Sequence, residues 1–319
     1  MELFRNAHID WLGRKWYFLS FSLLFSVAGV LSMLFWHHIP LGVDFKGGTE
    51  LTIPFNSSPN EDHIRQALAD AGIHDALIQR VAAGVGQSGN DVIISLPQSS
   101  ATDQAHDAGR IAVESALHTY YHDSGFGQPS VAIVGPTAGK QLQRQAALAT
   151  IYSLIGMLVY LWFRFELIYG VAAVVAVFHD TLITVGAFSL TNQEITLTVI
   201  AAILTLIGYS MNDTIVVFDR IRENLALSRR ESLSDVVNRS INQTLTRTVI
   251  SSGLTFLTVL SLLVFGGPVL RGFSFALTVG ILIGTYSSIA VAAPMLVAYQ
   301  DWRKRQGKVA NLPAKRARA

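Results

Sequence analysis

A single carboxyl group, that of Asp213, stands in the interior of an apolar run that extends from about Ile195 to Arg220. It follows Asn212 and precedes Arg220 by seven residues, a separation of about 10 Å at 1.5 Å per helical residue. Charged groups in a bilayer cost about 2.5–3.5 kcal/mol on insertion scales, so they mark functional sites by default. Because desolvation opposes the charge and a nearby cation favours it, such a carboxyl can bind and release protons. We expect a proton or ion relay at Asp213, with a structural hydrogen bond as the alternative.

Four further residues could take part in this relay, and the first is Asn212, directly before Asp213 in the chain. Arg247 opens the next apolar run and is the candidate cation for Asp213 if the two segments are neighbours, although it could equally be an anchor at the membrane surface. His179 and Asp180 lie near the middle of an earlier apolar run. They either complete the relay or pair with each other in a buried polar seam. Asp219, next to Arg220, is expected at the membrane interface.

The composition is that of a membrane protein. Of the 319 residues, 50% are hydrophobic and 14% are charged, about half the charged fraction of a soluble domain. The mean hydropathy is +0.40. A formal net charge of +2 gives no indication of nucleic-acid binding. The chain has no cysteine, which excludes disulfides, thiolate zinc sites and cysteine nucleophiles.

Six apolar segments are long enough to cross a hydrocarbon core about 30 Å thick. The first runs from Trp16 to Trp36, with a tryptophan at each interface, and no cleavage-site pattern follows it, so we expect an uncleaved anchor. The other five come after a polar stretch and lie between Arg144 and Arg164, Glu166 and about Leu190, about Ile195 and Arg220, Arg247 and Pro268, and Arg271 and Asp301.

The distribution of Lys and Arg predicts the orientation. If the N-terminus is cytoplasmic, 17 of the 24 Lys and Arg residues lie inside, and the short outer loops carry only Arg271. This is the positive-inside pattern, so we expect both termini in the cytoplasm. The predicted parts are the N-terminus with the first helix (1–36), an outer domain (37–143), a five-helix bundle (144–300) and a basic cytoplasmic tail (301–319).

The outer segment, from about Gly42 to Lys140, predicts strand, helix, strand, strand, helix, strand. Alternating apolar residues at 51, 53 and 55 indicate the first strand, and helical spacing over 61–71 and 103–121 indicates the two helices. The segments 76–83 and 92–96 form a predicted hairpin, and 131–134 is the closing strand. This order is that of the ferredoxin-like split βαβ motif.

Two motifs in the outer segment have simpler explanations than ligand binding. Gly84, Gly86 and Gly89 form a literal G-x-G-x-x-G, but a strand rather than a helix follows, which favours a hairpin tip over a nucleotide site. His118 and His122 have metal-ligand spacing without an evident third ligand, which favours an exposed pair. No catalytic triad or carboxylate pair is evident, so we expect neither an enzyme nor a bound metal.

Two other segments bear on assembly. Small residues recur every four positions through the sixth span, including Gly280 and Gly284, which predicts a close helix-packing face either within the chain or against another subunit. The segment 228–243 has apolar residues on one side and predicts an amphipathic helix on the cytoplasmic surface, with a solvated connector as the alternative.

Several of these stretches together resemble the SecF branch of the SecD/SecF family, bacterial protein-export subunits of the resistance-nodulation-division (RND) superfamily. The resemblance covers nearly the whole chain: GVDFKGGTEL from Gly42, VGP from Val134, FHD from Phe178, GYSMNDTIVVFDRIREN from Gly208 and RTVISSGLTFLTVLSLLVFGG from Arg247. It implies a six-span half-transporter with one periplasmic ferredoxin-like domain. In the family the fourth-span aspartate carries the proton-coupled step, and the matching residues here are Asp213 and Arg247.

The resemblance also implies partners and a location. These are SecD, the SecYEG channel, YajC, an unfolded preprotein substrate and, indirectly, SecA, in the lipids of the bacterial inner membrane. The implied function is use of the proton-motive force to assist preprotein translocation late in export. Sodium is an alternative coupling ion, because it would also suit a carboxylate site. An RND-type drug or lipid exporter and a passive translocon scaffold are the competing hypotheses.

Overall fold

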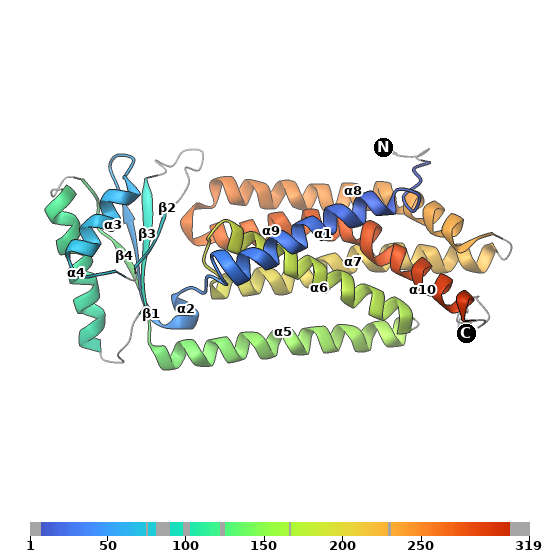
Figure 1. Ribbon diagram of the computed structural model, residues 1–319, viewed down its shortest axis with the longest axis horizontal. Coiled ribbons are helices and arrows are strands. Elements are labelled where there is room, and N and C mark those ends of the chain that lie inside the picture. Colours follow the sequence, from blue (N-terminus) through green and yellow to red (C-terminus); the bar gives the residue numbers. More distant parts are fainter. Residues whose placement is uncertain are drawn as a thin grey trace.

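The computed structural model describes residues 8–74, 76–80, 90–97, 103–121, 125–165, 167–228 and 231–306. It consists of a small α+β domain at one end and a bundle of long helices (Figure 1). Both ends of the described chain lie on the side of the bundle away from the small domain. The N-terminal segment is tied there to α8 (Leu233–Phe265), because Asn242 Oδ1 accepts a hydrogen bond of 3.1 Å from the Trp11 indole.

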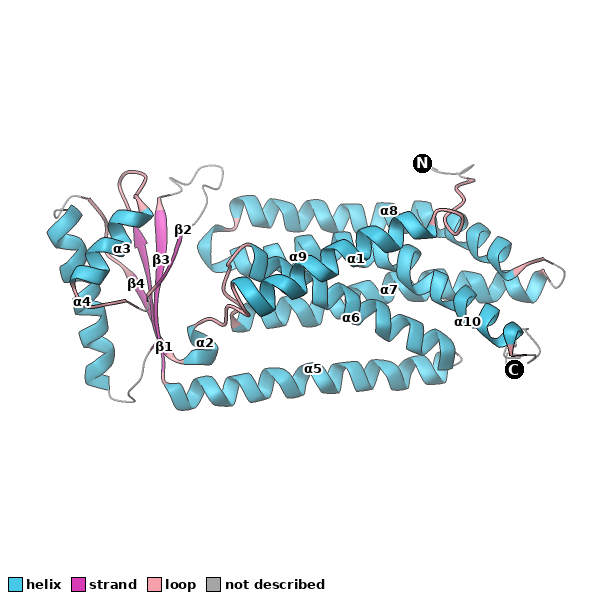
Figure 2. Ribbon diagram, in the orientation of Figure 1, coloured by secondary structure: helices cyan, strands magenta, loops and turns pink. Residues whose placement is uncertain are grey.

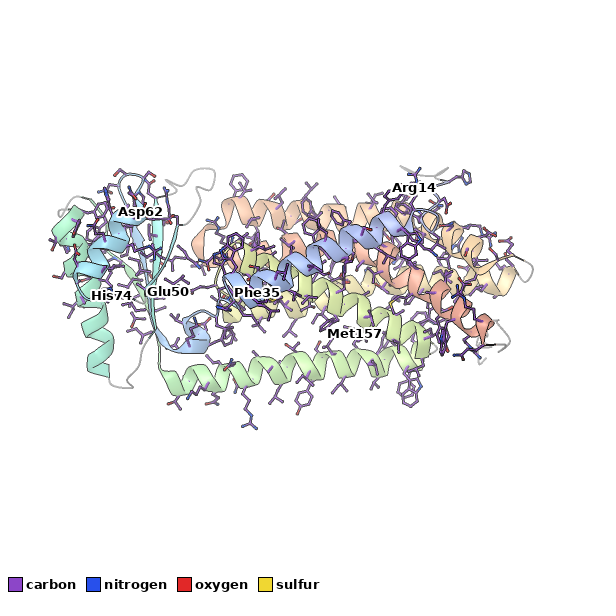
Figure 3. All side chains as sticks on the ribbon, in the orientation of Figure 1. Arg14, Phe35, Glu50, Asp62, His74 and Met157 are labelled. Atoms are coloured by element: carbon purple, nitrogen blue, oxygen red, sulfur yellow. The ribbon has the colours of Figure 1, made fainter. Side chains whose placement is uncertain are left out.

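Six segments among the described residues are long and apolar enough to cross a membrane, as predicted. The first comprises α1 (Lys15–Leu31) and a π-helix, η1 (Ser32–Trp36). The sixth comprises α9 (Gly267–Ser287), a second π-helix η2 (Ser288–Ala292) and α10 (Ala293–Arg305). The others are single helices: α5 (Pro136–Arg164), α6 (Leu167–Leu190), α7 (Leu197–Leu227) and α8. Phe35 illustrates the apolar outer surface, with 79% of its surface exposed (Figure 3).

Two helix boundaries differ from the sequence expectation. Helix α5 begins at Pro136, well before the apolar run, because proline suits the first turn of a helix, where its missing N–H needs no partner. The segment 228–243 is amphipathic, but its described residues, 228 and 231–243, form no separate surface helix. Its residues from Leu233 onward are the first turns of α8, capped by Ser232. Its apolar side is buried in the bundle core rather than facing lipid, and Asn224 of α7 bonds to Ser240 at 2.9 Å.

Close helix contacts in the bundle depend on glycines. A Cβ atom added at Gly284 of α9 would lie 3.0 Å from the Ser210 Cβ of α7, and one at Gly280 would overlap the Leu206 side chain. The small-residue face of the sixth span therefore packs within this chain. A second crossing, not predicted from the sequence, joins α1 to α6, where a Cβ at Gly186 would lie 2.7 Å from the Gly29 Cα.

The small domain has the predicted βαββαβ order, with β1 (Gly48–Pro54), α3 (Glu61–Asp70), β2 (Leu77–Arg80), β3 (Asp91–Pro97), α4 (Asp103–Tyr121) and β4 (Ser130–Val134). The sheet order β2-β3-β1-β4, antiparallel throughout, is ferredoxin-like (Figure 2). Alternate strand residues such as Leu51, Ile53 and Ile94 are buried against α3 and α4. A one-turn helix before β1, α2 (Val43–Lys46), was not predicted.

The two faces of this sheet have different neighbours. Helices α3 and α4 cover one face, and the other is turned toward the bundle (Figure 1). Because side chains alternate along a strand, Glu50 and its register partner Ser95 belong to the second face. Figure 3 shows Glu50 between the sheet and the bundle.

Candidate functional site

Asp213 is buried in the centre of the bundle, with 2% of its surface exposed. Its Oδ2 accepts a hydrogen bond of 2.7 Å from the Ser252 hydroxyl of α8 and a longer one of 3.4 Å from Thr285 of α9. Hydrogen bonds to a charged group are stronger than those between neutral partners, so these hydroxyls stabilise the ionised carboxylate. Three helices thus meet at one ionisable group inside the apolar bundle.

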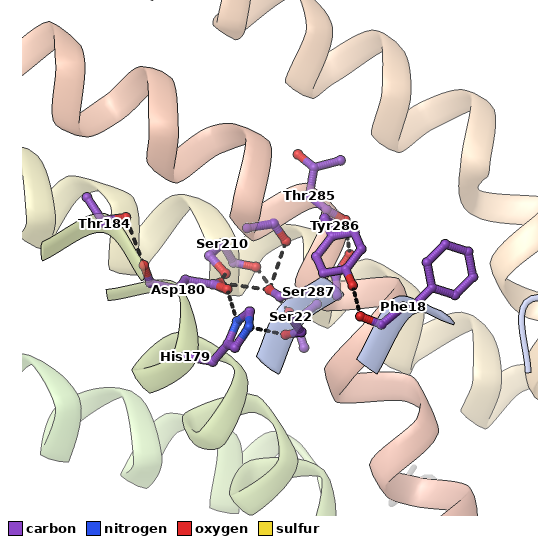
Figure 4. A network of polar contacts seen from close by, with 12 residues as sticks. Phe18, Ser22, His179, Asp180, Thr184, Ser210, Thr285, Tyr286 and Ser287 are labelled. Atoms are coloured by element: carbon purple, nitrogen blue, oxygen red, sulfur yellow. Dashed lines mark hydrogen bonds and ion pairs between the residues drawn. The ribbon is translucent and has the colours of Figure 1, made fainter. Parts of the chain in front are cut away.

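Asp180 of α6 forms a second buried centre (Figure 4), with 1% of its surface exposed. Its Oδ2 accepts hydrogen bonds from Ser210 at 2.5 Å and from Ser287 at 2.8 Å. Its Oδ1 lies 3.0 Å from the His179 Nδ1, and the other ring nitrogen of His179 contacts the Ser22 hydroxyl of α1. His179 and Asp180 therefore pair with each other and also link the first span to α7 and α9.

The two carboxyl groups share their supporting helices. Ser210 and Asp213 are three residues apart on α7, and Thr285 and Ser287 are two residues apart at the end of α9. The π-helix η2 follows directly after Ser287. π-Helical turns inside α-helices occur frequently at functional sites. Movement of α9 relative to α7 would therefore change the hydrogen bonds of both carboxyl groups together.

The structure does not place all the predicted relay residues in contact. Arg247 is an exposed residue of α8, and its charge acts on Asp213 from a distance. In the part of the chain that the structure describes, Asp213 has hydroxyl partners but no ion pair with Arg247. Asn212 is exposed and contributes no described hydrogen bond to the buried site. Asp219 forms ion pairs with Arg164 at 2.7 Å and Arg222 at 3.1 Å, near the end of α7 away from the small domain.

Sequence reasoning missed the hydroxyl groups that surround the carboxyls. The residues concerned are Ser22, Ser210, Ser252, Thr285 and Ser287. Serine and threonine are common in transmembrane helices, where their side chains hydrogen-bond between neighbouring helices. The available signal was their occurrence inside the same apolar runs as the carboxyl groups, but sequence position alone does not tell which helix faces which.

The small domain is attached directly to the helix that carries Asp213. Asp44 Oδ2, on α2, accepts a hydrogen bond of 2.8 Å from the backbone N–H of Leu197 at the start of α7. The first N–H groups of a helix have no partner within it and favour a negative charge. Asp44 therefore supplies to α7 the cap that its own Thr196 side chain does not provide.

The other motifs do not form a second site among the described residues. No group of three or more His, Cys, Asp or Glu that could hold a metal ion occurs there. His118 packs against Phe126 with ring centroids 4.8 Å apart. His122 and the glycines Gly84, Gly86 and Gly89 lie outside the described residues.

Two family descriptions match the chain. The family described as protein export membrane protein SecD/SecF, C-terminal, matches residues 113–302, and the SecD/SecF GG motif matches residues 37–59. The chain is 53% identical to a protein translocase subunit SecF of Koribacter versatilis, with 97% of this chain and 96% of that protein aligned. It is 40% identical to a protein translocase subunit SecF of Calditerrivibrio nitroreducens, with 96% of this chain and 99% of that protein aligned.

The fold also matches solved structures. A crystal structure of SecDF from Thermus thermophilus, described as a translocon-associated membrane protein, superimposes with a TM-score of 0.81 at 37% identity. A crystal structure of SecDF in a super-membrane-facing form superimposes with a TM-score of 0.67 at 37% identity. The chain spans 40% of the length of each SecDF chain and at least 94% of its own. With the six spans, the ferredoxin-like domain and these matches together, the chain belongs to the SecD/SecF family as a SecF subunit, a multi-pass membrane transport protein and not an enzyme.

Proposed function

We propose that this chain works in a SecD/SecF complex that uses the proton-motive force to assist preprotein translocation across the bacterial inner membrane, late in export through the Sec channel. The observation that carries the proposal is Asp213, an ionisable group buried where α7, α8 and α9 meet. Ionisable residues at this depth mark ion pathways and proton relays. The family membership supplies the export function.

The proposed cycle starts with protonation of Asp213 from the outer side. Neutralisation removes its attraction to the charge of Arg247 and weakens its hydrogen bonds to Ser252 and Thr285. The three helices then repack, and α7 transmits the movement to the small domain through Asp44. Release of the proton toward the cytoplasm restores the first arrangement.

The available energy limits what this movement can do. One elementary charge crossing 100 mV supplies about 2.3 kcal/mol. That is enough to bias a rearrangement between two states, and too little to unfold a folded domain. The cycle therefore ratchets a chain that is already unfolded.

The proposed role of the second centre is to connect this rearrangement to the first span. Asp180 bonds to Ser210 of α7 and Ser287 of α9, while its neighbour His179 contacts Ser22 of α1. Repacking of α7 against α9 would displace the Asp180 carboxyl group. Because Asp180 is bonded to His179, and His179 contacts Ser22, the displacement would also reach α1. In this proposal His179 and Asp180 couple the first span to the rearrangement in addition to pairing with each other.

The proposed topology places both termini in the cytoplasm and the small domain in the periplasm. It is supported by the positions of Lys and Arg and by the location of both described ends away from the small domain. The proposed partner is SecD, because the SecDF chains contain a further 60% of sequence beyond the part that aligns with this chain. SecYEG, YajC and, indirectly, SecA are the proposed wider partners.

The decisive experiment uses the chain co-expressed with SecD in inverted membrane vesicles. Preprotein translocation is followed with and without an imposed proton gradient for wild type and Asp213→Asn. We expect the gradient-dependent part to be lost in Asp213→Asn while complex assembly stays intact. Undiminished gradient-dependent translocation would refute the proposal and favour a passive scaffold. A parallel sodium gradient distinguishes the two candidate ions.

An RND-type exporter of drugs or lipids is the other alternative. Such exporters usually have twelve spans and two large outer domains in one chain, whereas this chain has six candidate spans and one small domain among its described residues. Efflux of a hydrophobic dye from intact cells would test this alternative. We expect no difference between cells with and without the chain.

A further inference from the structure

The loop between α6 and α7 forms a continuous junction with the small domain. The backbone N–H of Gly42 donates to the Ile195 carbonyl at 3.0 Å, and the Ile195 N–H donates to the Pro40 carbonyl at 2.7 Å. From the sheet, the Gln79 side chain donates to the Asn192 carbonyl at 2.9 Å. Two separate parts of the small-domain segment thus hold one short loop of the bundle.

Glu194 lies inside this junction and is 8% exposed. A Cβ atom added at Gly42 would lie 3.1 Å from its Oε2, so the carboxyl group is closely packed. The groups that act on it come from three elements of the small domain: Asp44 and Lys46 on α2, Glu50 on β1 and Ser95 on β3. Figure 3 shows Glu50 on the sheet face that looks toward the bundle.

The junction brings three carboxyl groups together with one ammonium group. Burying an ionised carboxylate is costly unless it is paired, and Lys46 cannot balance Asp44, Glu50 and Glu194 together. Burial therefore raises the pKa of Glu194 to about 7, with Glu50 and Asp44 adding to the shift and Ser95 and Lys46 opposing it. Burial, with a smaller contribution from Asp44, also raises the pKa of Glu50.

We propose that Glu194 is a protonation-dependent clasp between the small domain and the helix bundle. With a neutral carboxyl the two parts stay packed together. With an ionised carboxyl the charge gains hydration by leaving the junction, so the sheet separates from the loop. The Asp44–Leu197 hydrogen bond and the chain segments at 37–42 and near 135 keep the small domain attached to the bundle. The clasp is distinct from Asp213, which lies within the membrane bundle.

The direction of the pH effect follows from the difference in proton binding by Glu194 between the packed and the separated form of the junction. The carboxyl has a pKa of about 7 in the packed junction and an ordinary value of 4.5 when exposed. The packed form therefore binds more protons, and the stabilisation it gains is complete below pH 4.5 and lost as the pH rises to about 7. Across that window the equilibrium constant for docking falls on the order of a hundredfold. Acid at the outer face closes the clasp.

The clasp can be measured on the full chain in lipid nanodiscs, because the chain has no cysteine of its own. Spin labels are attached at His63→Cys on α3 and Val269→Cys on α9, both exposed positions. The distance distribution between them is recorded by double electron–electron resonance from pH 4.5 to pH 8. We expect one short, narrow distance at low pH and a growing longer component as the pH rises toward 7.

Glu194→Gln imitates the neutral carboxyl, so its distances should stay short at every pH. Glu61→Gln removes an exposed carboxyl of the same domain and should behave as wild type. If the distance distribution of the wild-type chain does not change with pH, the proposal is overturned, and no substitution at Glu194 is needed to show it. A Glu194→Gln chain that opens with pH as wild type does would also overturn it. Neither result depends on translocation, so failure of the clasp is distinguishable from failure of proton coupling at Asp213.

Discussion

Asp44 of the small domain caps the helix whose interior holds Asp213. Its carboxylate accepts a 2.8 Å hydrogen bond from the Leu197 N–H at the first turn of α7. Asp213 lies sixteen residues further along the same helix, about 24 Å at 1.5 Å per residue. One continuous helix therefore joins the small domain to the buried carboxyl, and a displacement at either end reaches the other.

Removing this cap should loosen the start of α7. Asp44→Ala leaves the Leu197 N–H without its acceptor, a loss of about 1 kcal/mol. We expect faster hydrogen exchange of the backbone amides in the first turn of α7. Asp44→Asn is the matched control, because an asparagine oxygen caps a helix about as well and should keep the protection. Equal exchange in Asp44→Ala and wild type would show that the cap contributes nothing.

The Ser252 hydroxyl should matter for proton coupling because it is the closest donor to Asp213, at 2.7 Å. Ser252→Ala leaves the carboxylate with one fewer hydrogen bond, which costs about 1.5–3 kcal/mol for a charged group. We expect a lower rate of gradient-dependent translocation in vesicles, with assembly unchanged. Ser251→Ala removes a neighbouring exposed hydroxyl and should have no effect. The role assigned to Ser252 would be wrong if the two variants were indistinguishable.

Ser210 should be important for stability, because it donates to the buried Asp180 at 2.5 Å. Ser210→Ala leaves Ser287 as the other hydroxyl donor to the same oxygen. We expect a loss of about 1–3 kcal/mol, measured as a lower unfolding temperature in detergent. Thr205→Ala is the control, since its hydroxyl is exposed and bonds only to the carbonyl of its own helix at Ala201. A stability loss as large in the control would contradict the prediction.

The α1–α6 crossing should not tolerate a side chain. In Gly186→Ala the new Cβ would lie 2.7 Å from the Gly29 Cα, a backbone atom that moves only with its helix. We expect a loss of about 1–3 kcal/mol from overpacking and weaker contact between Ser22 and His179. Gly208→Ala is the control, because no atom lies within 4 Å of the added Cβ. The unfolding temperatures of both variants and of wild type are measured in nanodiscs of one composition. An unfolding temperature of Gly186→Ala equal to that of wild type would contradict the prediction.

Local patterns were sufficient for the elements and their order. A run of about twenty apolar residues indicates a span wherever it occurs, and alternation at 51, 53 and 55 indicates a strand, because both depend only on near neighbours. Boundaries were less accurate: α5 begins at Pro136 and α8 at Leu233, since continuation of a helix past its apolar run depends on what covers it. Hence the segment 228–243 was expected to lie on the membrane surface.

The sequence by itself determined that a carboxyl group is buried in the membrane at Asp213, and that another lies beside His179, because no neighbour in an apolar helix can hydrate them. Only the tertiary structure decided their partners. Asp213 meets Ser252 and Thr285, 39 and 72 residues away, because α7, α8 and α9 cross at that depth. For the same reason Glu194, an ordinary loop residue in the sequence, becomes a buried acid: its environment is made by strands more than ninety residues earlier in the chain.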